Sequence, residues 1–313
     1  MSAETQQIPP LAQTVAALSD LDTLPQMFHH GTSDSKLPSA PVLQQIIDLT
    51  RSVIFPGYYG RSAIDPDTVA YHMGTRLERL TGLLTGQIES GLCFACDDAP
   101  RTKGGATGCD LCRERARRLA MTLVSRLPEL RRVLATDVEA AYLGDPAAQS
   151  RGEVIACYPA IKALTCYRLA HELHTLGVPL IPRIITEMAH SETGIDIHPA
   201  ATIGTHFTID HGTGVVIGAT CIIGNHVKIY QGVTLGARSF PLDEGGNPIK
   251  NNPRHPIIED NVIIYSNATI LGRVTIGANS VIGANVWLTA SLPPNSKATL
   301  PTPKLPSPPD PLR

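Results

Sequence analysis

The chain has 313 residues, a formal net charge of −2 and 42% hydrophobic residues. This length allows one large or two ordinary domains, and the apolar content is sufficient for a packed core. A nearly neutral chain is not adapted to a polyanion or an anionic membrane surface, so neither nucleic acid nor membrane is expected as a partner. No basic and apolar leader and no apolar run of about 18 residues is recognisable, so we expect a cytoplasmic protein.

The first part of the chain is predicted to be mainly helical. Residues 1–40 contain scattered prolines and are expected to form a poorly ordered segment, whereas residues 41–194 are expected to form a helical domain. Within this domain apolar residues recur at helical spacing, with Gly177 as a stop signal. The helical stretches are expected at 42–90, 113–127, 135–143, 164–173 and 182–190.

A Gly- and Cys-rich insert at 91–112 interrupts the helical pattern. It contains two Cys-x-x-Cys pairs, Cys93 with Cys96 and Cys109 with Cys112. Four thiolates in this arrangement can close a tetrahedral structural zinc site. A redox or disulfide pair and cysteines without a ligand remain open alternatives. The odd total of 7 cysteines argues against a disulfide framework.

From residue 195 onward an aliphatic residue returns every six positions. The first run comprises Ile197, Ile203 and Ile209, then Ile217, Ile223, Ile229 and Leu235; the second comprises Ile258, Ile264, Ile270, Ile276, Ile282 and Leu288. This period fits neither an α-helix nor a single strand, and it is typical of a parallel β-helix with three short strands in each coil. The predicted fold class is therefore α+β, with a helical N-terminal domain followed by a β-helix at 195–292.

Two segments do not fit this repeat. Residues 236–257 are rich in Gly, Pro, Asn and charge and are predicted to project from the β-helix as a functional loop. Residues 293–313 are rich in proline and are predicted to form a disordered tail.

The repeat also slips once, by two residues, between Ile209 and Ile217. This slip holds His211-Gly212-Thr213-Gly214, and a glycine-rich break in a strict repeat often marks a bulge or a close approach to a ligand. Asp196 lies about one coil earlier. A neutral imidazole can take the proton of an attacking alcohol, and a carboxylate can orient that imidazole. The pair is therefore a candidate acid–base site.

Five motifs together resemble the serine O-acetyltransferases. They are Asp-Pro-Ala at 145–147, Asp-Ile-His-Pro-Ala at 196–200, Ile-Asp-His at 209–211, Gln-Gly-Val-Thr-Leu-Gly at 231–236 and Arg-His-Pro at 254–256. The resemblance covers about 130–295. It implies a left-handed β-helix, transfer of acetyl from acetyl-CoA to the hydroxyl of L-serine in cysteine biosynthesis, and no catalytic metal. It also implies a homotrimer or a dimer of trimers with the active site between subunits.

The resemblance assigns a role to several residues. His211 would be the general base and Asp196 its orienting carboxylate, Asp145 and Asp210 would hold the serine ammonium, and Arg254 and His255 would hold its carboxylate. Backbone near Gly236, Ala237 and Ala284 is expected to contact acetyl-CoA. The long loop and the missing Ala-x-Gly-x-Pro-Ala segment after the β-helix depart from the family pattern.

Two other functions compete with this interpretation. Another O-acetyltransferase of the same scaffold could act on a sugar or a different hydroxy-amino acid. A β-helix zinc lyase would use His206 and His211, which have His-x₄-His spacing, with a third ligand from a neighbouring coil. Many family members dock a C-terminal peptide ending in isoleucine into the sulfhydrylase that uses their product. This chain ends in Pro-Leu-Arg, so no such docking is expected.

Overall fold

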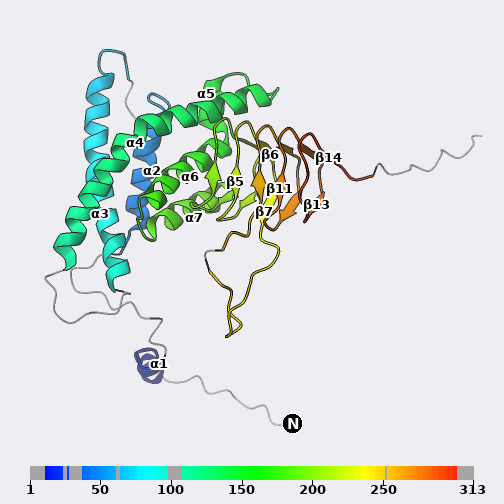
Figure 1. Ribbon diagram of the computed structural model, residues 1–313. Helices are drawn as coiled ribbons and strands as arrows, with labels where there is room; N and C mark the ends of the chain where they lie inside the picture. Colours follow the sequence, from blue (N-terminus) through cyan, green and yellow to red (C-terminus); the bar gives the residue numbers. More distant parts are fainter. Residues whose placement is uncertain are drawn as a thin grey trace, which may run out of the picture.

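The computed structural model describes residues 11–23, 27, 37–60, 64–97, 108–250 and 252–301. A helical domain lies against one end of a β-helix, and the long loop projects from the β-helix (Figure 1). The helices are α1 (Leu11–Leu18), α2 (Ala40–Ile54), α3 (Val69–Asp97), α4 (Gly108–Gly144), α5 (Arg151–Cys157), α6 (Pro159–Thr175) and α7 (Ile181–Thr193). No helix of the described ranges is long and apolar enough to cross a membrane.

Helix α4 differs most from the predicted elements. Separate helices at 113–127 and 135–143 were expected, but the structure has one helix of 37 residues with Pro128 inside it. A proline removes one backbone donor and usually breaks a helix. Here the apolar stripe continues through it, because Leu123, Leu127, Leu130 and Leu134 are all buried. Packing of this stripe outweighs the local cost of the proline.

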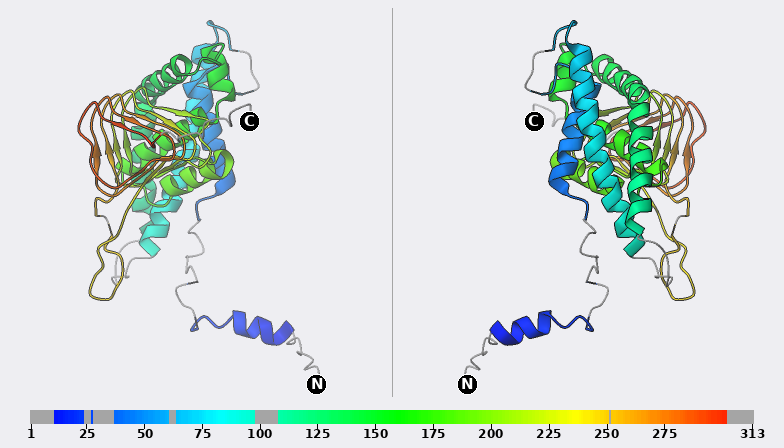
Figure 2. Two further views of the ribbon diagram at one scale, coloured as in Figure 1. Left: turned by 90° about the vertical axis from the view of Figure 1, so that its right-hand side faces the viewer. Right: turned by 90° about the vertical axis from the view of Figure 1, so that its left-hand side faces the viewer.

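The ends of the Cys-rich insert also belong to helices. Helix α3 continues to Asp97 and α4 begins at Gly108, and the two helices lie side by side (Figures 1 and 2). Residues 98–107 lie outside the described residues. Near the N-terminus, α1 falls within the segment predicted to be poorly ordered, and it buries none of its side chains.

The β-helix is built from short parallel strands that follow one another around a three-sided prism. The strands are β1 (Asp196–Ile197), β2 (Thr202–Ile203), β3 (Thr208–Asp210), β4 (Val216–Ile217), β5 (Ile222–Ile223), β6 (Lys228–Tyr230), β7 (Thr234–Gly236), β8 (Ile257–Ile258), β9 (Ile263–Ile264), β10 (Thr269–Leu271), β11 (Thr275–Ile276), β12 (Val281–Ile282), β13 (Trp287–Leu288) and β14 (Lys297–Ala298). They form three sheets with the orders β1-β4-β7-β10-β13, β11-β8-β5-β2 and β14-β12-β9-β6-β3.

The register stacks the six-residue repeat in columns. Ile197 pairs with Ile217, which pairs with Leu235, and the column continues through Ile270. These side chains are 0–2% exposed, so each column fills the narrow interior. Beyond the predicted boundary at 292, β14 pairs with β12, and the N–H of Val281 bonds to the carbonyl of Ser296. Backbone hydrogen bonds thus extend the β-helix beyond its aliphatic repeat.

We name the three edges of the prism by a residue on each. The His211 edge lies between β3 and β4 and between β6 and β7, the Arg254 edge lies between β1 and β2 and between β7 and β8, and the His206 edge lies between β2 and β3 and between β5 and β6. The loop between Gly236 and Ile257 leaves from the Arg254 edge and forms an antiparallel bridge from Leu242 to Pro248. Figure 1 shows this loop as the long excursion below the strands.

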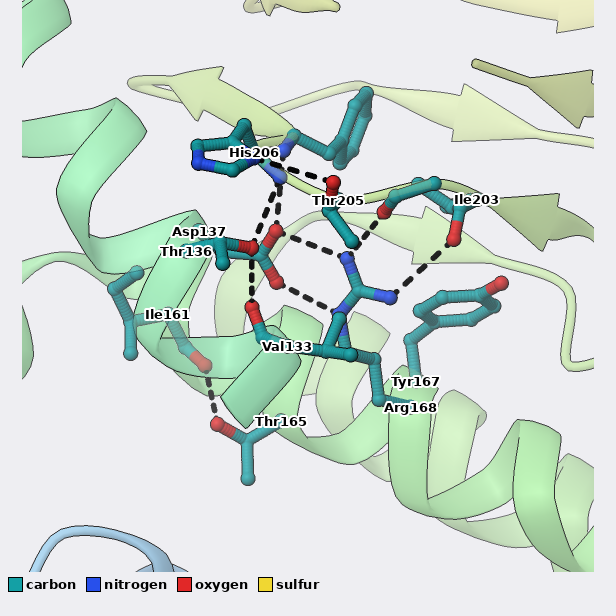
Figure 3. A network of polar contacts seen from close by, with 12 residues as sticks. Val133, Thr136, Asp137, Ile161, Thr165, Tyr167, Arg168, Ile203, Thr205 and His206 are labelled. Carbon is teal, nitrogen blue, oxygen red and sulfur yellow. Dashed lines mark hydrogen bonds and ion pairs between the residues drawn. The ribbon is translucent and has the colours of Figure 1, made fainter. Parts of the chain in front are cut away.

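A buried ion pair joins the two domains (Figure 3). Arg168 of α6 donates from Nε and Nη2 to the two carboxylate oxygens of Asp137 of α4, at 2.7 and 2.9 Å. Arg168 also donates to the carbonyls of Ile203 and Gly204, and Asp137 accepts the N–H of Phe207. Helices α4 and α6 and the β2–β3 turn therefore meet at one ion pair whose charged groups are hydrogen-bonded.

Candidate active site

The slip in the repeat places His211 at the surface of the His211 edge. Its backbone has φ +58°, and Gly212 and Gly214 that follow also have positive φ. The imidazole is 77% exposed, and its Nε2 lies 3.8 Å from Oδ1 of Asp210. A side chain on Gly212 would collide with Ile195, so glycine is required there. The extra residues thus leave the imidazole accessible beside a carboxylate.

Asp196 does not contact His211 in the structure. Within the described residues it forms neither a hydrogen bond nor an ion pair with the imidazole; the carboxylate within ion-pair distance is Asp210. Asp196 lies at the start of β1 and pairs with Val216, five residues after His211. The two segments are neighbours, as expected from the repeat. The imidazole, however, stands on the irregular slip rather than on the paired strand.

Asp145 joins this edge from the helical domain. It follows α4, and its carboxylate accepts the Tyr158 hydroxyl at 2.5 Å and the N–H of Ala147 at 2.8 Å. These two hydrogen bonds lower the pKa of Asp145, and the nearby charges of Lys228 and His211 lower it further. The bond to Asp145 raises the pKa of Tyr158 to about 12. Asp145 is therefore held ionised near His211.

Lys228 links Asp210 to Gly144, the residue that precedes Asp145. Its Nζ donates to the carbonyl of Gly144 at 2.7 Å and lies 3.3 Å from Oδ2 of Asp210. The predicted residues Asp145, Asp210 and His211 are thus brought together around a lysine that sequence reasoning missed. Tyr158 was missed as well. The hydrogen-bond partners of Lys228 and Tyr158 lie 84 and 13 positions away in the sequence, so no local pattern identifies these two residues.

The Arg254 edge carries the other predicted substrate residues. The backbone N–H groups of Arg254 and His255 both donate to Oγ1 of Thr220, at 2.9 and 3.1 Å. Nδ1 of His255 accepts the N–H of Thr220, so the neutral ring carries its proton on Nε2. Arg273, also missed by the sequence analysis, donates to the carbonyls of Thr220 and His255.

Arg254 has unused hydrogen-bonding capacity. Its Nη1 donates to the carbonyl of Asn252, and its guanidinium lies 5.8 Å from the ring centre of Phe240. Its Nε is buried and has no hydrogen-bond partner among the described residues. A buried donor of this kind is costly unless a ligand satisfies it. Arg254 borders a cavity of about 720 Å³ under the projecting loop, and His174 and Lys250 also line this cavity.

Burial and positive neighbours keep the histidines of this edge neutral. Burial is the main cause that lowers the pKa of His255 to about 4, and the charges of Arg254 and Arg273 add to it. Burial, then the charge of Arg183, lowers the pKa of His198 to about 4 as well. Nδ1 of His198 accepts the N–H of Ala200. The edge therefore presents permanent positive charge from arginine and neutral donors from histidine.

The two groups of predicted residues do not meet within one chain. They lie on different edges of the prism, separated by the strands of one sheet. The backbone predicted to contact CoA is divided in the same way. Gly236 and Ala237 lie at the Arg254 edge, whereas Ala284 follows β12 toward the His211 edge.

The zinc lyase arrangement is not supported by the geometry. His206 and His211 lie at opposite ends of β3. The ring of His206 instead stacks on His226, with the ring centres 4.1 Å apart. The ring of His171 bonds to the carbonyl of Pro199, on the Arg254 edge.

The described cysteines of the insert lie close together at the ends of α3 and α4. Cys93 and Cys112 are buried and Cys96 is exposed, and the Sγ atoms of Cys96 and Cys112 are 3.8 Å apart. The side chain of Cys109 lies outside the description. No group of three or more metal-ligating side chains is found among the side chains that the structure describes. The four-cysteine zinc site therefore stays a prediction.

The β-helix and its repeat define a hexapeptide-repeat transferase. Residues 255–290 match the family model "Bacterial transferase hexapeptide (six repeats)". A serine acetyltransferase encoded on a plasmid of Synechococcus elongatus is 51% identical over 290 residues, which are 91% of this chain and 89% of that protein. The chain belongs to the serine acetyltransferase family. Six further curated serine acetyltransferases match over 51–59% of their own lengths.

Solved structures agree with this assignment. Entamoeba histolytica serine acetyltransferase 1 in complex with L-cysteine superposes with a TM-score of 0.69 at 33% identity, over 91% of this chain and 94% of that one. The serine acetyltransferase of Brucella abortus in complex with coenzyme A superposes with a TM-score of 0.53 at 27% identity, over 83% of this chain and 93% of that one.

Proposed function

We infer that this protein is a serine O-acetyltransferase, which transfers acetyl from acetyl-CoA to the hydroxyl of L-serine and gives O-acetyl-L-serine and CoA. The observation that carries the inference is the 51% identity to a serine acetyltransferase over 91% of the chain, together with the exposed His211 beside two carboxylates. The product of this reaction is a precursor of cysteine in the family that the chain belongs to.

His211 is proposed as the general base. A serine hydroxyl has a pKa far above neutrality, so its proton must leave as the oxygen attacks. The hydroxyl proton passes to the imidazole, the new C–O bond forms at the thioester carbonyl, and the C–S bond breaks. The imidazolium then protonates the leaving CoA thiolate, which restores the neutral base. Asp210, 3.8 Å away, stabilises the transient positive charge.

Asp145 and Asp210 are proposed to hold the serine ammonium. Both carboxylates lie near His211, and Lys228 and Tyr158 fix their positions. Gln231 offers a further acceptor: its Oε1 is buried without a partner among the described residues, and it follows Tyr230, which pairs with Asp210. Asp196 remains the proposed orienting carboxylate, in an arrangement that requires its side chain to turn toward His211.

The serine carboxylate is proposed to bind at the Arg254 edge. The unsatisfied Nε of Arg254 and the Nε2–H of neutral His255 are the donors that a planar carboxylate requires. One chain cannot present both edges to one serine molecule, because a sheet of the prism separates them. A second subunit must therefore bring its Arg254 edge to the His211 edge of the first. A cyclic trimer, the assembly that the family resemblance implies, repeats this contact in a closed ring, and a dimer of trimers preserves it.

Acetyl-CoA would bind at the same boundary between neighbouring subunits. Gly236 and Ala237 at the Arg254 edge and Ala284 near the His211 edge would then face each other from neighbouring subunits, which favours a CoA site along the subunit boundary. A cytoplasmic location is retained as a proposal, whereas the expectation about docking falls on the tail. Residues 302–313 of the tail lie outside the described residues.

A structural zinc ion is proposed at the ends of α3 and α4. In a tetrahedral thiolate site with Zn–S bonds of about 2.3 Å, neighbouring sulfurs lie about 3.8 Å apart. The Sγ atoms of Cys96 and Cys112 have this separation, 3.8 Å. Cys93 and Cys109 would complete the ligand set, and the ion would tie the two helices together without taking part in acetyl transfer.

Metal analysis of protein purified under reducing conditions tests the zinc proposal. About one zinc per chain is expected, with loss of zinc and a lower melting temperature in Cys96→Ser. Cys157→Ser is the matched control, because Cys157 is an exposed cysteine at the end of α5. Protein without zinc, or equal zinc in both variants and the wild type, would reject the site.

The acetyl transfer itself is tested by CoA release from purified protein with a panel of acceptors. L-Serine should be the best acceptor, and analogues that lack either the amine or the carboxylate should be poor. The sugar alternative predicts instead that simple hexoses are acetylated as fast as serine. That result would overturn the proposed substrate.

A further inference from the structure

A second cavity, of about 890 Å³, is lined by residues of the helical domain. It opens between α2, α3 and the turn at 55–60 that follows α2. Three arginines line it, Arg51, Arg76 and Arg79, together with Gln45, Asp48 and Tyr59. None of these residues belongs to the proposed acetyl-transfer site.

The three guanidinium groups use few of their hydrogen-bond donors. Arg76 donates from Nη1 to the carbonyl of Ser52 at 3.2 Å, and Arg79 donates from Nη2 to Oε1 of Gln45 at 3.1 Å. Arg51 lies with its guanidinium carbon 4.0 Å from the ring centre of Tyr59. Each guanidinium has five N–H donors, so most donors face the cavity or solvent.

These arginines also lack carboxylate partners among the described residues. Elsewhere arginines commonly have one: Arg113, Arg118, Arg126, Arg132, Arg151, Arg168 and Arg183 all form ion pairs. The acidic residue of the cavity, Asp48, accepts a hydrogen bond from Gln44 instead. Three like charges around one cavity repel each other, and a bound anion would offset this repulsion.

The cavity is held in shape by its surroundings. The Tyr59 hydroxyl donates to the carbonyl of Ile155 in α5, so the ring under Arg51 is fixed to another helix. A Cβ on Gly60 would lie 3.2 Å from Nη2 of Arg76, so the turn closes tightly over that guanidinium. Arg51 and Arg76 are half-buried, which makes their interactions with an anion stronger than those of fully exposed side chains.

We propose that this cavity binds a small ligand through a tetrahedral oxyanion, a phosphate or sulfate group. Planar guanidiniums with several parallel N–H donors suit such a group, and three of them around one cavity can share its oxygens. The group can be free in solution or carried on a metabolite; the chemistry at the three arginines is the same. The site is separate from the acetyl-transfer site and does not depend on that activity.

Titration calorimetry on the full-length protein tests the proposal, with inorganic phosphate, sulfate and glycerol phosphate as probes at constant ionic strength. Saturable binding is expected, weakened about tenfold or more by Arg51→Gln and by Arg79→Gln. Arg79 is exposed, so its replacement keeps the proposal testable if Arg51→Gln unfolds the domain. Arg131→Gln is the matched control, because Arg131 is exposed on α4 and has no ion pair among the described residues.

The probes separate the two sources of the oxyanion. Tighter binding of glycerol phosphate identifies a phosphorylated metabolite, whereas equal binding of all three identifies the free oxyanion. No saturable binding of any probe would overturn the proposal. Binding that Arg51→Gln and Arg79→Gln leave unchanged would overturn it too, because the anion would then occupy another site.

Discussion

The imidazole of His211 is the group on which the proposed chemistry depends. It stands on a two-residue slip of the β-helix, is 77% exposed and lies within 3.8 Å of Asp210. The left-handed backbone at His211 is not unusual in itself, since His206, His226 and several asparagines at the corners also have positive φ. What distinguishes His211 is the convergence of Asp145, Asp210 and Lys228 around it.

Replacing His211 with alanine should lower kcat at least ~10²-fold, because the imidazole is the proposed acceptor of the serine hydroxyl proton. His226→Ala is the matched control: this exposed histidine lies on the His206 edge and should leave kcat close to the wild-type value. Asp196→Asn should lower kcat by less than His211→Ala. Turnover of His211→Ala near that of the wild type would remove His211 from the mechanism.

The neutral histidines at the Arg254 edge make stability depend on pH. Burial lowers the pKa of His198 and of His255 to about 4, below the ordinary value of 6.5. As the pH falls, these two histidines are therefore protonated in the unfolded chain before they are protonated in the folded protein. The stabilisation is fully present above about pH 6.5 and is lost as the pH falls toward about 4.

His198→Asn should reduce this pH dependence, because the asparagine oxygen can still accept the N–H of Ala200 but does not titrate. Thermal unfolding between pH 7 and pH 4 measures the effect, with His190→Asn on α7 as the control. The melting temperature of His198→Asn should fall less steeply with acidification than that of the wild type. Equal slopes in both proteins would contradict the account of His198.

Among the elements, α4 and α6 are attached to the β-helix by a buried charge pair. Asp137 is fully buried, and Arg168 is 8% exposed. Asp137→Asn would leave an uncompensated buried guanidinium, and breaking such pairs costs about 3–5 kcal/mol. Glu129→Gln is the control, since its pair with Arg132 is on the surface and exposed pairs contribute about 0–1 kcal/mol.

Chemical denaturation of the two variants measures both costs. The free energy of unfolding should fall by several kcal/mol in Asp137→Asn and change little in Glu129→Gln. Asp137→Asn molecules that remain folded should keep the acetyl-transfer geometry. A similar small loss in both variants would show that the pair is not what joins the two domains.

The elements also show where sequence reasoning succeeds and where it fails. The aliphatic period of six predicted the coils, because each inward position must be filled by a side chain of fixed size. The predicted separation of helices at 113–127 and 135–143 does not occur, since the buried stripe on both sides of Pro128 holds α4 together. The Asp137–Arg168 pair spans 31 positions and could not be read from local spacing.

For the site, the sequence motifs identified the groups but not their arrangement. His211 and Asp210 were predicted and lie together. Asp145 is placed near them by the bond of Tyr158 to its carboxylate and by the bond of Lys228 to the carbonyl of Gly144. The expected contact of Asp196 with His211 is absent among the described residues. Side-chain direction on an irregular turn depends on packing that a repeat pattern does not contain.

At the scale of the whole molecule, the central claim is that one active site is built from two subunits. The residues proposed to form the two halves of the serine site lie on different edges of the prism, the His211 edge and the Arg254 edge. In this proposal each half binds one end of the serine zwitterion, and both halves are required for activity. A variant of one half should therefore complement a variant of the other half in a mixed assembly.

Coexpression of His211→Ala chains with Arg254→Gln chains, followed by measurement of CoA release at low serine concentration, tests this claim most directly. Each homogeneous variant should be nearly inactive. In a randomly mixed cyclic assembly, about a quarter of the sites would combine an intact His211 edge with an intact Arg254 edge, so about a quarter of the wild-type activity should return. Mixed assemblies no more active than the separate variants would contradict a site shared between subunits.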